Sequence, residues 1–261
     1  MKWSPEAEAA IDKVPFFIRK KVKKKVAAHV ENCGRSLVHL SDVTALKQQF
    51  LAKGGMAKQV KGYDVSTCFG SEGCPHAACS SADLMTDLEN LVKQADILLF
   101  LKYSLGENIK YHHEFRIALC DCPNACSRPQ IADIGIMGAV MPVVGAADCT
   151  GCDACVKVCP DMAVHWTDQK EKPVIDMDQC RRCGKCIQVC PAHTIEKAAS
   201  GFRILLGGRL GRHPRLALEM PGLYSPEQVL TVVRTCLDFY KTHAKNGQRF
   251  SQLFNRIDQV L

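Results

Sequence analysis

Long hydrophobic runs are absent from this sequence. The longest apolar stretch, residues 134–147, is too short to cross a bilayer and is interrupted by Pro142. The first residues, Met1 to Glu6, contain neither an apolar core nor a small-residue cleavage site, so we expect no signal peptide. These absences predict a chain without a membrane span in a reducing cytoplasm.

The composition also lacks the biases of non-globular chains. Of 261 residues, 47% are hydrophobic and 23% are charged, which excludes disorder, collagen and a coiled coil as descriptions of the whole chain. Tryptophan is scarce, with two residues, whereas cysteine is abundant, with 16. In a reducing compartment, thiols hold metal more often than they form disulfides. The cysteine content therefore predicts metal centres.

The formal net charge of +7 is compatible with nucleic acid, an acidic protein or an anionic substrate as partner. Much of it lies in residues 19–26, where Ile18, Val22, Val26 and Val30 recur every four residues. This pattern predicts a helix with one apolar face and one solvated basic face. We favour that interpretation over nucleic-acid binding.

Several elements can be expected from periodicity and capping residues. Residues 1–55 are expected to form a small helical module, with a helix end at Gly34 and a second helix from Ser41 to about residue 51. The expected elements downstream are a helix carrying Leu84 to Val92, strands at 97–101, 115–119, 134–144 and 202–206, and a helix from Ser225 to His243. Strands mixed with helices and divided by a cysteine-rich block indicate an α+β fold with an insertion.

Eight cysteines form two runs of identical spacing. The runs are Cys149-x2-Cys152-x2-Cys155-x3-Cys159-Pro160 and Cys180-x2-Cys183-x2-Cys186-x3-Cys190-Pro191. In such runs three thiolates bind one cubane and the fourth reaches the other cluster of the pair. We therefore assign one cluster to Cys149, Cys152, Cys155 and Cys190, and the second to Cys180, Cys183, Cys186 and Cys159. Zinc is the competing interpretation, but paired zinc sites usually have two-by-two cysteine spacing. Residues 146–198 resemble a bacterial two-cluster ferredoxin, which implies one-electron transfer between linked centres.

Four further cysteines form two pairs about fifty residues apart: Cys68 with Cys74, and Cys122 with Cys126. The two pairs could close around another cubane. Cys79 and Cys120 lie close to these positions and could replace a ligand, although Pro123-Asn124 directly after Cys122 favour Cys122. For Cys33 and Cys236 we expect the role of small buried apolar residues.

The pattern Cys-x5-Cys followed by Cys-Pro-Asn-x-Cys resembles the nitrite and sulfite reductases. Residues 127–135 look like the segment after that motif in dissimilatory-type sulfite reductases, and residues 207–214 are similar to a glycine-rich, arginine-bearing stretch of the family. The resemblance implies that residues 60–145 and 199–261 form a cluster domain around the ferredoxin insertion. It also implies a [4Fe–4S] cluster on Cys68, Cys74, Cys122 and Cys126, with Cys126 also reaching the iron of a sirohaem. Asn124, Arg209 and Arg212 would contact that cofactor.

Reduction of sulfite or nitrite needs cations that hold a small oxyanion and supply protons as its oxygens leave. The candidates lie between or beside the cysteine pairs, and they are Lys102, Lys110, His112, His113, Arg116 and Arg128. An external electron-donor protein would feed the ferredoxin clusters.

The N-terminal segment shows a second resemblance. Trp3, residues 5–8, residues 14–19 and Gly34 look like the small domain at the C-terminus of a light-independent protochlorophyllide reductase subunit, which implies an accessory role beside iron–sulfur chemistry. The long N-terminal half of full-length sulfite reductases, which grips the sirohaem and the substrate, has no counterpart here. A partner subunit or a second copy could complete the pocket.

Two hypotheses follow. The first is a small anaerobic sirohaem-dependent sulfite or nitrite reductase, or its subunit, with three [4Fe–4S] clusters; we favour it. The alternative is a non-catalytic three-cluster electron-transfer subunit of a larger redox complex. Neither involves nucleic acid.

Overall fold

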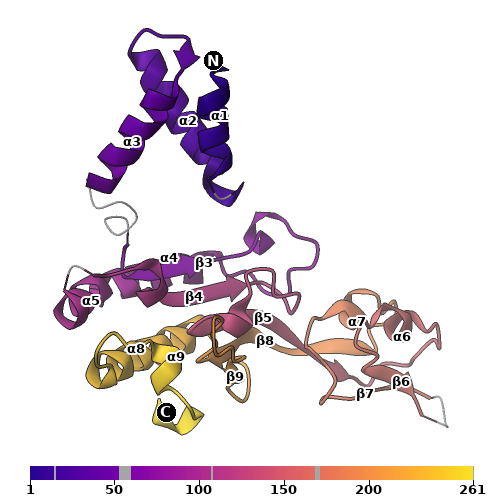
Figure 1. The fold of residues 1–261 in the computed structure, drawn as a ribbon. Coiled ribbons are helices and arrows are strands. Elements are labelled where there is room, and N and C mark those ends of the chain that lie inside the picture. The colour runs from indigo at the N-terminus through magenta and orange to yellow at the C-terminus, as the bar shows by residue number, and fades with distance from the viewer. Residues whose placement is uncertain (15, 53–59, 107, 168–170, 261) are drawn as a thin grey trace. The chain divides into compact units, whose positions relative to one another are not determined.

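The structure is a computed structural model that describes residues 1–14, 16–52, 60–106, 108–167 and 171–260 (Figure 1). The chain divides into two compact units, Met1–Val60 and Lys61–Leu261. Among the described residues, no helix is long and apolar enough to span a membrane.

In its described residues, the first unit contains three helices and a two-stranded parallel sheet. Its elements are β1 (Lys2–Trp3), α1 (Pro5–Asp12), α2 (Phe16–Asn32), β2 (Leu37–Val38) and α3 (Leu40–Ala52). Ser4 caps α1, because its hydroxyl accepts a hydrogen bond from the N–H of Ala7 (3.2 Å). Val26 and Val30 of α2 are buried in the core of this unit, and Val22 packs against them. The expected apolar face of the basic helix is thus present.

The second unit is built on a five-stranded mixed sheet with the order β3-β4-β5-β8-β9. Its strands are β3 (Tyr63–Ser66), β4 (Phe115–Cys120), β5 (Ile134–Val144), β8 (Ile195–Leu206) and β9 (Leu218–Glu219). The first three strands run parallel, and β8 and β9 join in antiparallel fashion. Because β3 and β4 run in the same direction, their carboxyl ends meet at one edge of the sheet.

Helices cover one face of this sheet. They are α4 (Ala82–Gln94), α5 (Ile97–Leu105), α8 (Pro226–His243) and α9 (Phe250–Leu253). Phe115 of β4 contacts the rings of Tyr240 on α8 and Phe250 on α9, with centroid distances of 5.5 and 5.6 Å. Cys120, Met137 and Leu205 form a separate cluster. Since Cys120 and Phe115 are five positions apart on one strand, their side chains point to opposite faces.

The strand expected at residues 97–101 is wrong, because this segment is the start of α5. The carboxylate of Asp96 caps the helix by accepting a hydrogen bond from the N–H of Leu99 (3.3 Å). Ile97 and Leu101 are buried, whereas Leu99 is 47% exposed, which is the burial pattern of a helix. A run of five apolar residues has no polar positions to reveal its period, so the sequence was ambiguous here.

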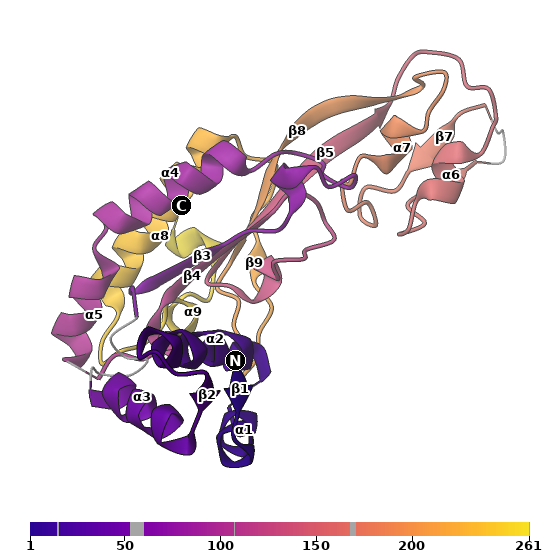
Figure 2. The same cartoon turned by 90° about the horizontal axis from the view of Figure 1, so that it is seen from above.

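Strands β5 and β8 continue beyond the sheet as a long two-stranded ribbon, which Figure 2 shows leading to the cysteine-rich segment 145–194. The pairing register shifts between Met141 and Pro142. The segment itself contains α6 (Ala154–Val158), β6 (Val164–Trp166), β7 (Pro173–Ile175) and α7 (Lys185–Gln188). Short 3-10 turns occur at Gly70–Glu72, Tyr111–His113, Pro129–Ile131 and Ile257–Gln259.

Candidate metal centres

Twelve cysteines lie in three groups of four, here called sites 1, 2 and 3. Site 1 is Cys149, Cys152, Cys155 and Cys190; site 2 is Cys180, Cys183, Cys186 and Cys159; site 3 is Cys68, Cys74, Cys122 and Cys126. Sites 1 and 2 belong to segment 145–194, and site 3 lies at the carboxyl ends of β3 and β4.

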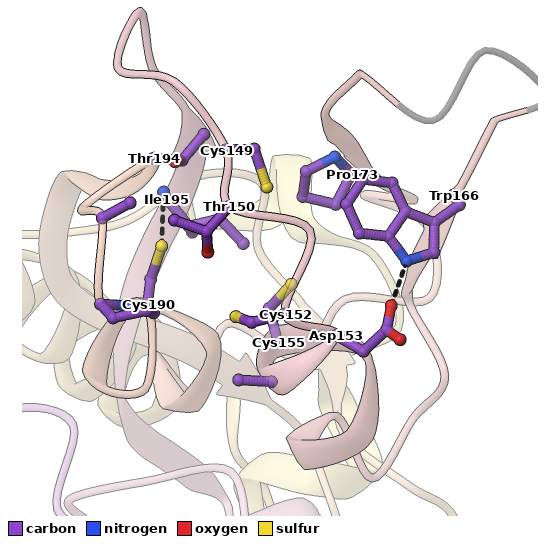
Figure 3. A pocket seen from close by; sticks show the side chains of 13 residues that line it. Cys149, Thr150, Cys152, Asp153, Cys155, Trp166, Pro173, Cys190, Thr194 and Ile195 are labelled. Atoms are coloured by element: carbon purple, nitrogen blue, oxygen red, sulfur yellow. Dashed lines mark hydrogen bonds between the residues drawn. The ribbon is translucent and has the colours of Figure 1, made fainter.

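The four thiols of site 1 line one pocket (Figure 3). Cys155 is buried on α6; burial raises the pKa of its thiol, and the nearby Cys149 and Cys190 raise it further. The N–H of Ile195 donates to the Sγ of Cys190 (3.4 Å). Trp166 closes one side of the pocket and donates from Nε1 to the carboxylate of Asp153 (2.6 Å). Cys190, from the second cysteine run, therefore lies with three cysteines of the first run.

Site 2 has the reciprocal arrangement, in which one cysteine of the first run joins three cysteines of the second run. Cys186 on α7 is buried, and burial, together with the nearby Cys180, Cys183 and Cys159, raises the pKa of its thiol to about 12. The N–H of Arg182 donates to the Sγ of Cys180 (3.4 Å). Cys159, from the first run, thus lies with three cysteines of the second run.

Site 3 joins two segments that are distant in sequence. Burial raises the pKa of Cys122, and the neighbouring Cys74, Cys126 and Cys68 raise it further. The Sγ of Cys68 accepts hydrogen bonds from the N–H groups of Gly70 (3.3 Å) and Asp121 (3.4 Å). Cys126 is exposed, so this site is open to a further ligand on one side.

Cys120 differs from the four thiols of site 3. It is 1% exposed, packs against Met137 and Leu205, and its thiol donates to the carbonyl oxygen of Cys122 (3.3 Å). Burial raises the pKa of Cys120 to about 12. Because Cys122 lies beside the three other thiols, the geometry favours Cys122 as the ligand.

The remaining cysteines have other surroundings. The backbone N–H of Cys79 donates to the carbonyl oxygen of Asp121 (3.2 Å). Cys236 is fully buried within α8, as expected of a small apolar residue, whereas Cys33 is exposed, against expectation. Cys33 directly follows the last residue of α2.

Asp121 connects the segments of site 3 and was not anticipated from the sequence. Its side chain is 1% exposed, and Oδ1 accepts hydrogen bonds from the N–H (3.1 Å) and hydroxyl (2.6 Å) of Ser81. Its carbonyl oxygen accepts from the N–H of Ala78 (2.7 Å). The carboxylate also lies against Gly70, where a Cβ atom would come within 2.4 Å of it. In the sequence, the position of an acidic residue between Cys120 and Cys122 could have indicated this role.

The structure separates the predicted cations into two sets. Arg128 and Asn124 are exposed on the same loop as Cys126, and the N–H of Arg128 donates to the carbonyl oxygen of Ala125 (2.8 Å).

Three of the other five predicted cations, Lys102, Lys110 and Arg116, lie at the opposite end of the strands, and His112 and His113 belong to the 3-10 turn that precedes β4. Arg116 is the second residue of β4 and donates from Nη2 to the carbonyl oxygen of Tyr111 (3.4 Å), so it is about 13 Å along the strand from Cys120. Lys110 precedes the same strand end. Lys102 lies on α5, whose first turn contacts Gly62 at the amino end of β3. The structure therefore does not bring these three residues to the cysteines. They lie near the amino ends of β3 and β4, whereas site 3 lies at the carboxyl ends of the same strands.

The loop after β8 packs against the segment that follows Cys126, because the N–H of Ala217 donates to the carbonyl oxygen of Gln130 (2.8 Å). Arg209, however, directs its guanidinium to backbone carbonyls, donating to His213 (2.9 Å) and Ser251. Arg212 is exposed. Arg209 thus anchors the C-terminal segment in this structure, and Arg212 is the arginine of the loop that faces solvent.

The donor chemistry of all three sites fits an iron–sulfur cluster. Among residues 1–14, 16–52, 60–106, 108–167 and 171–260, no three His, Cys, Asp or Glu side chains converge on the position of a single metal ion. The three groups consist of thiols alone, and a cubane holds its four thiolates further apart than a single ion does.

Comparison with protein families gives two matches. The family described as nitrite and sulphite reductase 4Fe-4S domain matches residues 63–259, and the family described as proto-chlorophyllide reductase 57 kD subunit matches residues 3–47.

Curated relatives match over part of their length. The coenzyme F420-dependent sulfite reductase of Methanocaldococcus jannaschii is 37% identical over 137 residues, covering 52% of this chain and 22% of the relative. A subunit of the anaerobic sulfite reductase of Salmonella typhimurium is 30% identical over 129 residues, covering 49% of this chain and 32% of the relative. The matches therefore span less than a third of these relatives. Among solved structures, dissimilatory sulfite reductase I aligns over 76% of this chain and 53% of that chain, with 14% identity and a TM-score of 0.45.

Proposed function

This chain belongs to the nitrite and sulphite reductase 4Fe-4S domain family, and from that premise we propose that it is the cluster-binding subunit of a sulfite or nitrite reductase. The observation that carries the proposal is site 3, where four thiols from two distant segments meet and Cys126 remains exposed. The exposed thiol of Cys126 leaves room for a sirohaem beside this cluster.

The proposed cofactors are three [4Fe–4S] clusters, one at each site, and a sirohaem at Cys126. When bound, the clusters would supply one-electron transfer, and the sirohaem would supply the position at which the oxyanion is reduced. Residues 146–198 would act as an inserted two-cluster ferredoxin domain, and residues 60–145 and 199–261 as the domain that carries site 3. The all-thiol donor sets and the backbone N–H groups directed at Cys68, Cys180 and Cys190 support this assignment.

The loop that follows Cys122 would orient the cofactor and the substrate. Asn124 and Arg128 are exposed on either side of Cys126, so their side chains are free to meet an anionic group there. Arg128 would hold negative charge on an oxyanion such as sulfite or nitrite, since a guanidinium forms strong charge-assisted hydrogen bonds with such groups. Arg212, exposed on the neighbouring loop, is the proposed partner for the sirohaem carboxylates.

Exposed apolar side chains around site 3 support a partner subunit or a second copy of the chain. Phe69, next to Cys68, is 79% exposed, and Leu216 is 68% exposed. Leu216 precedes Ala217, which, like Cys68 and Ala125, packs against the cluster of Cys120, Met137 and Leu205. Clusters of exposed apolar residues usually mark a surface that a ligand or partner covers. The partner would also supply the cations that Lys102, Lys110 and Arg116 do not provide at this edge.

The N-terminal unit would provide the docking surface for the electron-donor protein. Residues 1–60 contain 12 Lys and Arg against 5 Asp and Glu, so this unit alone accounts for the net charge of +7. Lys20, Lys21, Lys24 and Lys25 are exposed on α2. A basic surface of this kind would accelerate docking of an acidic donor, in a manner that salt weakens.

A second candidate is a three-cluster electron-transfer subunit without sirohaem. The position of Lys102, Lys110 and Arg116, away from the cysteines, favours it, because the chain then offers few cations for an oxyanion.

Sulfite-dependent oxidation of reduced methyl viologen separates the two candidates. The reductase predicts that the anoxically purified chain contains extractable sirohaem and that sulfite or nitrite perturbs its absorption bands, with turnover by the chain alone or after addition of its partner. Full iron without sirohaem, and no spectral response to either anion, would establish the electron-transfer subunit instead.

A further inference from the structure

Strand β5 connects site 2 with the cluster of Cys120, Met137 and Leu205, which packs against Cys68 of site 3 and is here called the wall of site 3. Met137 on β5 is 3% exposed and packs against Cys120. Three residues further along, Val140 donates its N–H to the carbonyl oxygen of Arg182 (2.8 Å) and forms a backbone bridge with Cys183. The two positions are about 10 Å apart along the strand.

Site 1 lies further along the same strand. Val144 pairs with Ile195, and the N–H of Gly145 donates to the carbonyl oxygen of Thr194 (2.7 Å). Thr194 and Ile195 line the pocket of site 1. Val144 is seven residues beyond Met137, or roughly 23 Å along an extended strand. Site 2 is therefore the neighbour of site 3, and site 1 is the more remote of the two.

One buried side chain joins site 2 to the wall of site 3. Arg203 of β8 is 8% exposed and pairs in register with Met137. Its guanidinium donates to both carboxylate oxygens of Glu219 (2.7 and 2.5 Å), approaches the Sδ of Met137 (3.5 Å) and donates to the carbonyl oxygen of Arg181 (3.3 Å). Arg181 directly follows Cys180 of site 2.

The chemistry of arginine suits this position. A buried charge is costly unless it is paired, and Glu219 supplies the opposite charge for Arg203. The planar guanidinium presents donors in fixed directions, so one side chain holds β5, β9 and the loop of site 2 at once. A lysine ammonium has the charge but not this fork.

We propose that Arg203 is a positioning residue that holds the loop of site 2 against the wall of site 3, and thereby makes site 2 the immediate electron donor to site 3. This inference rests on the proposed function, because both sites must hold clusters. In the step, one electron leaves the reduced cluster of site 2 and enters the oxidised cluster of site 3, and no bond is made or broken. An external one-electron reductant replaces the electron.

The test compares Arg203→Met and Arg203→Lys with the control Arg256→Met, which removes an exposed arginine paired with Asp258 (3.3 Å). Each holoprotein is purified anoxically, its iron is counted, and it is mixed rapidly with dithionite while electron paramagnetic resonance follows the clusters. We expect reduction of site 3 to be at least tenfold slower in Arg203→Met, intermediate in Arg203→Lys and unchanged in the control, with reduction of site 1 unaffected in all three.

Wild-type rates of site 3 reduction in both Arg203 variants, with full iron, would overturn the proposal. If the variants lose iron, the test is made on the wild-type protein. Electron paramagnetic resonance of the partially reduced protein should then reveal a spin–spin interaction between the clusters of sites 2 and 3, and absence of this interaction would overturn the proposal. An iron count that shows no cluster at site 3 would refute the proposed function itself, so the two failures are distinguishable.

Discussion

Replacement of Asp121 by alanine is expected to destabilise the segment that carries site 3. The Oδ1 atom of Asp121 accepts two hydrogen bonds from Ser81, which is itself 1% exposed. Hydrogen bonds to a charged group contribute about 1.5–3 kcal/mol each, so loss of both predicts about 3–6 kcal/mol. That is a large share of the about 5–15 kcal/mol that stabilises a typical domain.

Asparagine at the same position provides the matched control. It keeps an acceptor for Ser81 and removes the charge, and the Oδ2 atom of Asp121 has no hydrogen-bond partner among the described residues. We therefore expect Asp121→Asn to cost about 1 kcal/mol or less, since only the charge assistance is lost.

Anoxic urea unfolding, followed by circular dichroism, measures the difference through the transition midpoints. The iron content of each variant gives an independent readout: Asp121→Ala should lose the iron of site 3 and keep that of sites 1 and 2. Equal destabilisation by alanine and asparagine would refute the role assigned to Oδ1.

Three other perturbations test separate parts of the account. Cys126→Ser should abolish coupling between sirohaem and site 3 and leave the clusters of sites 1 and 2 intact; an unchanged absorption and resonance spectrum would show that Cys126 is not a ligand. Burial alone would raise the pKa of Glu219, but hydrogen bonds and charge from Arg203 outweigh it and hold this pKa below its ordinary value. The stability that Glu219 contributes is therefore present above about pH 4.3 and is lost as pH falls through its lower folded pKa. The difference in free energy of unfolding between the wild type and Glu219→Gln should shrink on acid titration. A difference that does not depend on pH would contradict this. Arg215 donates to the carbonyl oxygens of Gly207 (2.8 Å), Ser251 (3.0 Å) and Phe254 (2.6 Å), so Arg215→Lys should cost about 2–3 kcal/mol in urea unfolding, and no loss would exclude that anchor.

The prediction of how the cysteines group rests on local patterns in the sequence. The spacing assigns Cys159 and Cys190 each to the group of the other run, and in the structure Cys159 lies near Cys180 and Cys190 lies near Cys155. Such an assignment is possible from the sequence because short loops of fixed length constrain which thiols can meet. The helix from Ser225 was also evident, since Ser225 and Gln228 form a capping box at its start.

Contacts that depend on strand direction could not be predicted in the same way. Lys102 and Arg116 are close to the cysteines in sequence, but β4 carries Cys120 to the other end of the sheet. The role of Arg203 could not be predicted from the sequence, because its partners come from three separate segments. They are Met137, Arg181 and Glu219. The register of β5 and β8, which brings them together, is a property of the folded sheet.

The most direct test of the central claim, that site 3 holds a cluster next to a sirohaem, is the iron content and visible spectrum of the anoxically purified protein. The account predicts about thirteen iron atoms per chain, from three cubanes and one sirohaem, together with sirohaem absorption bands. About eight iron atoms per chain without those bands would show that only sites 1 and 2 are filled, and would contradict it.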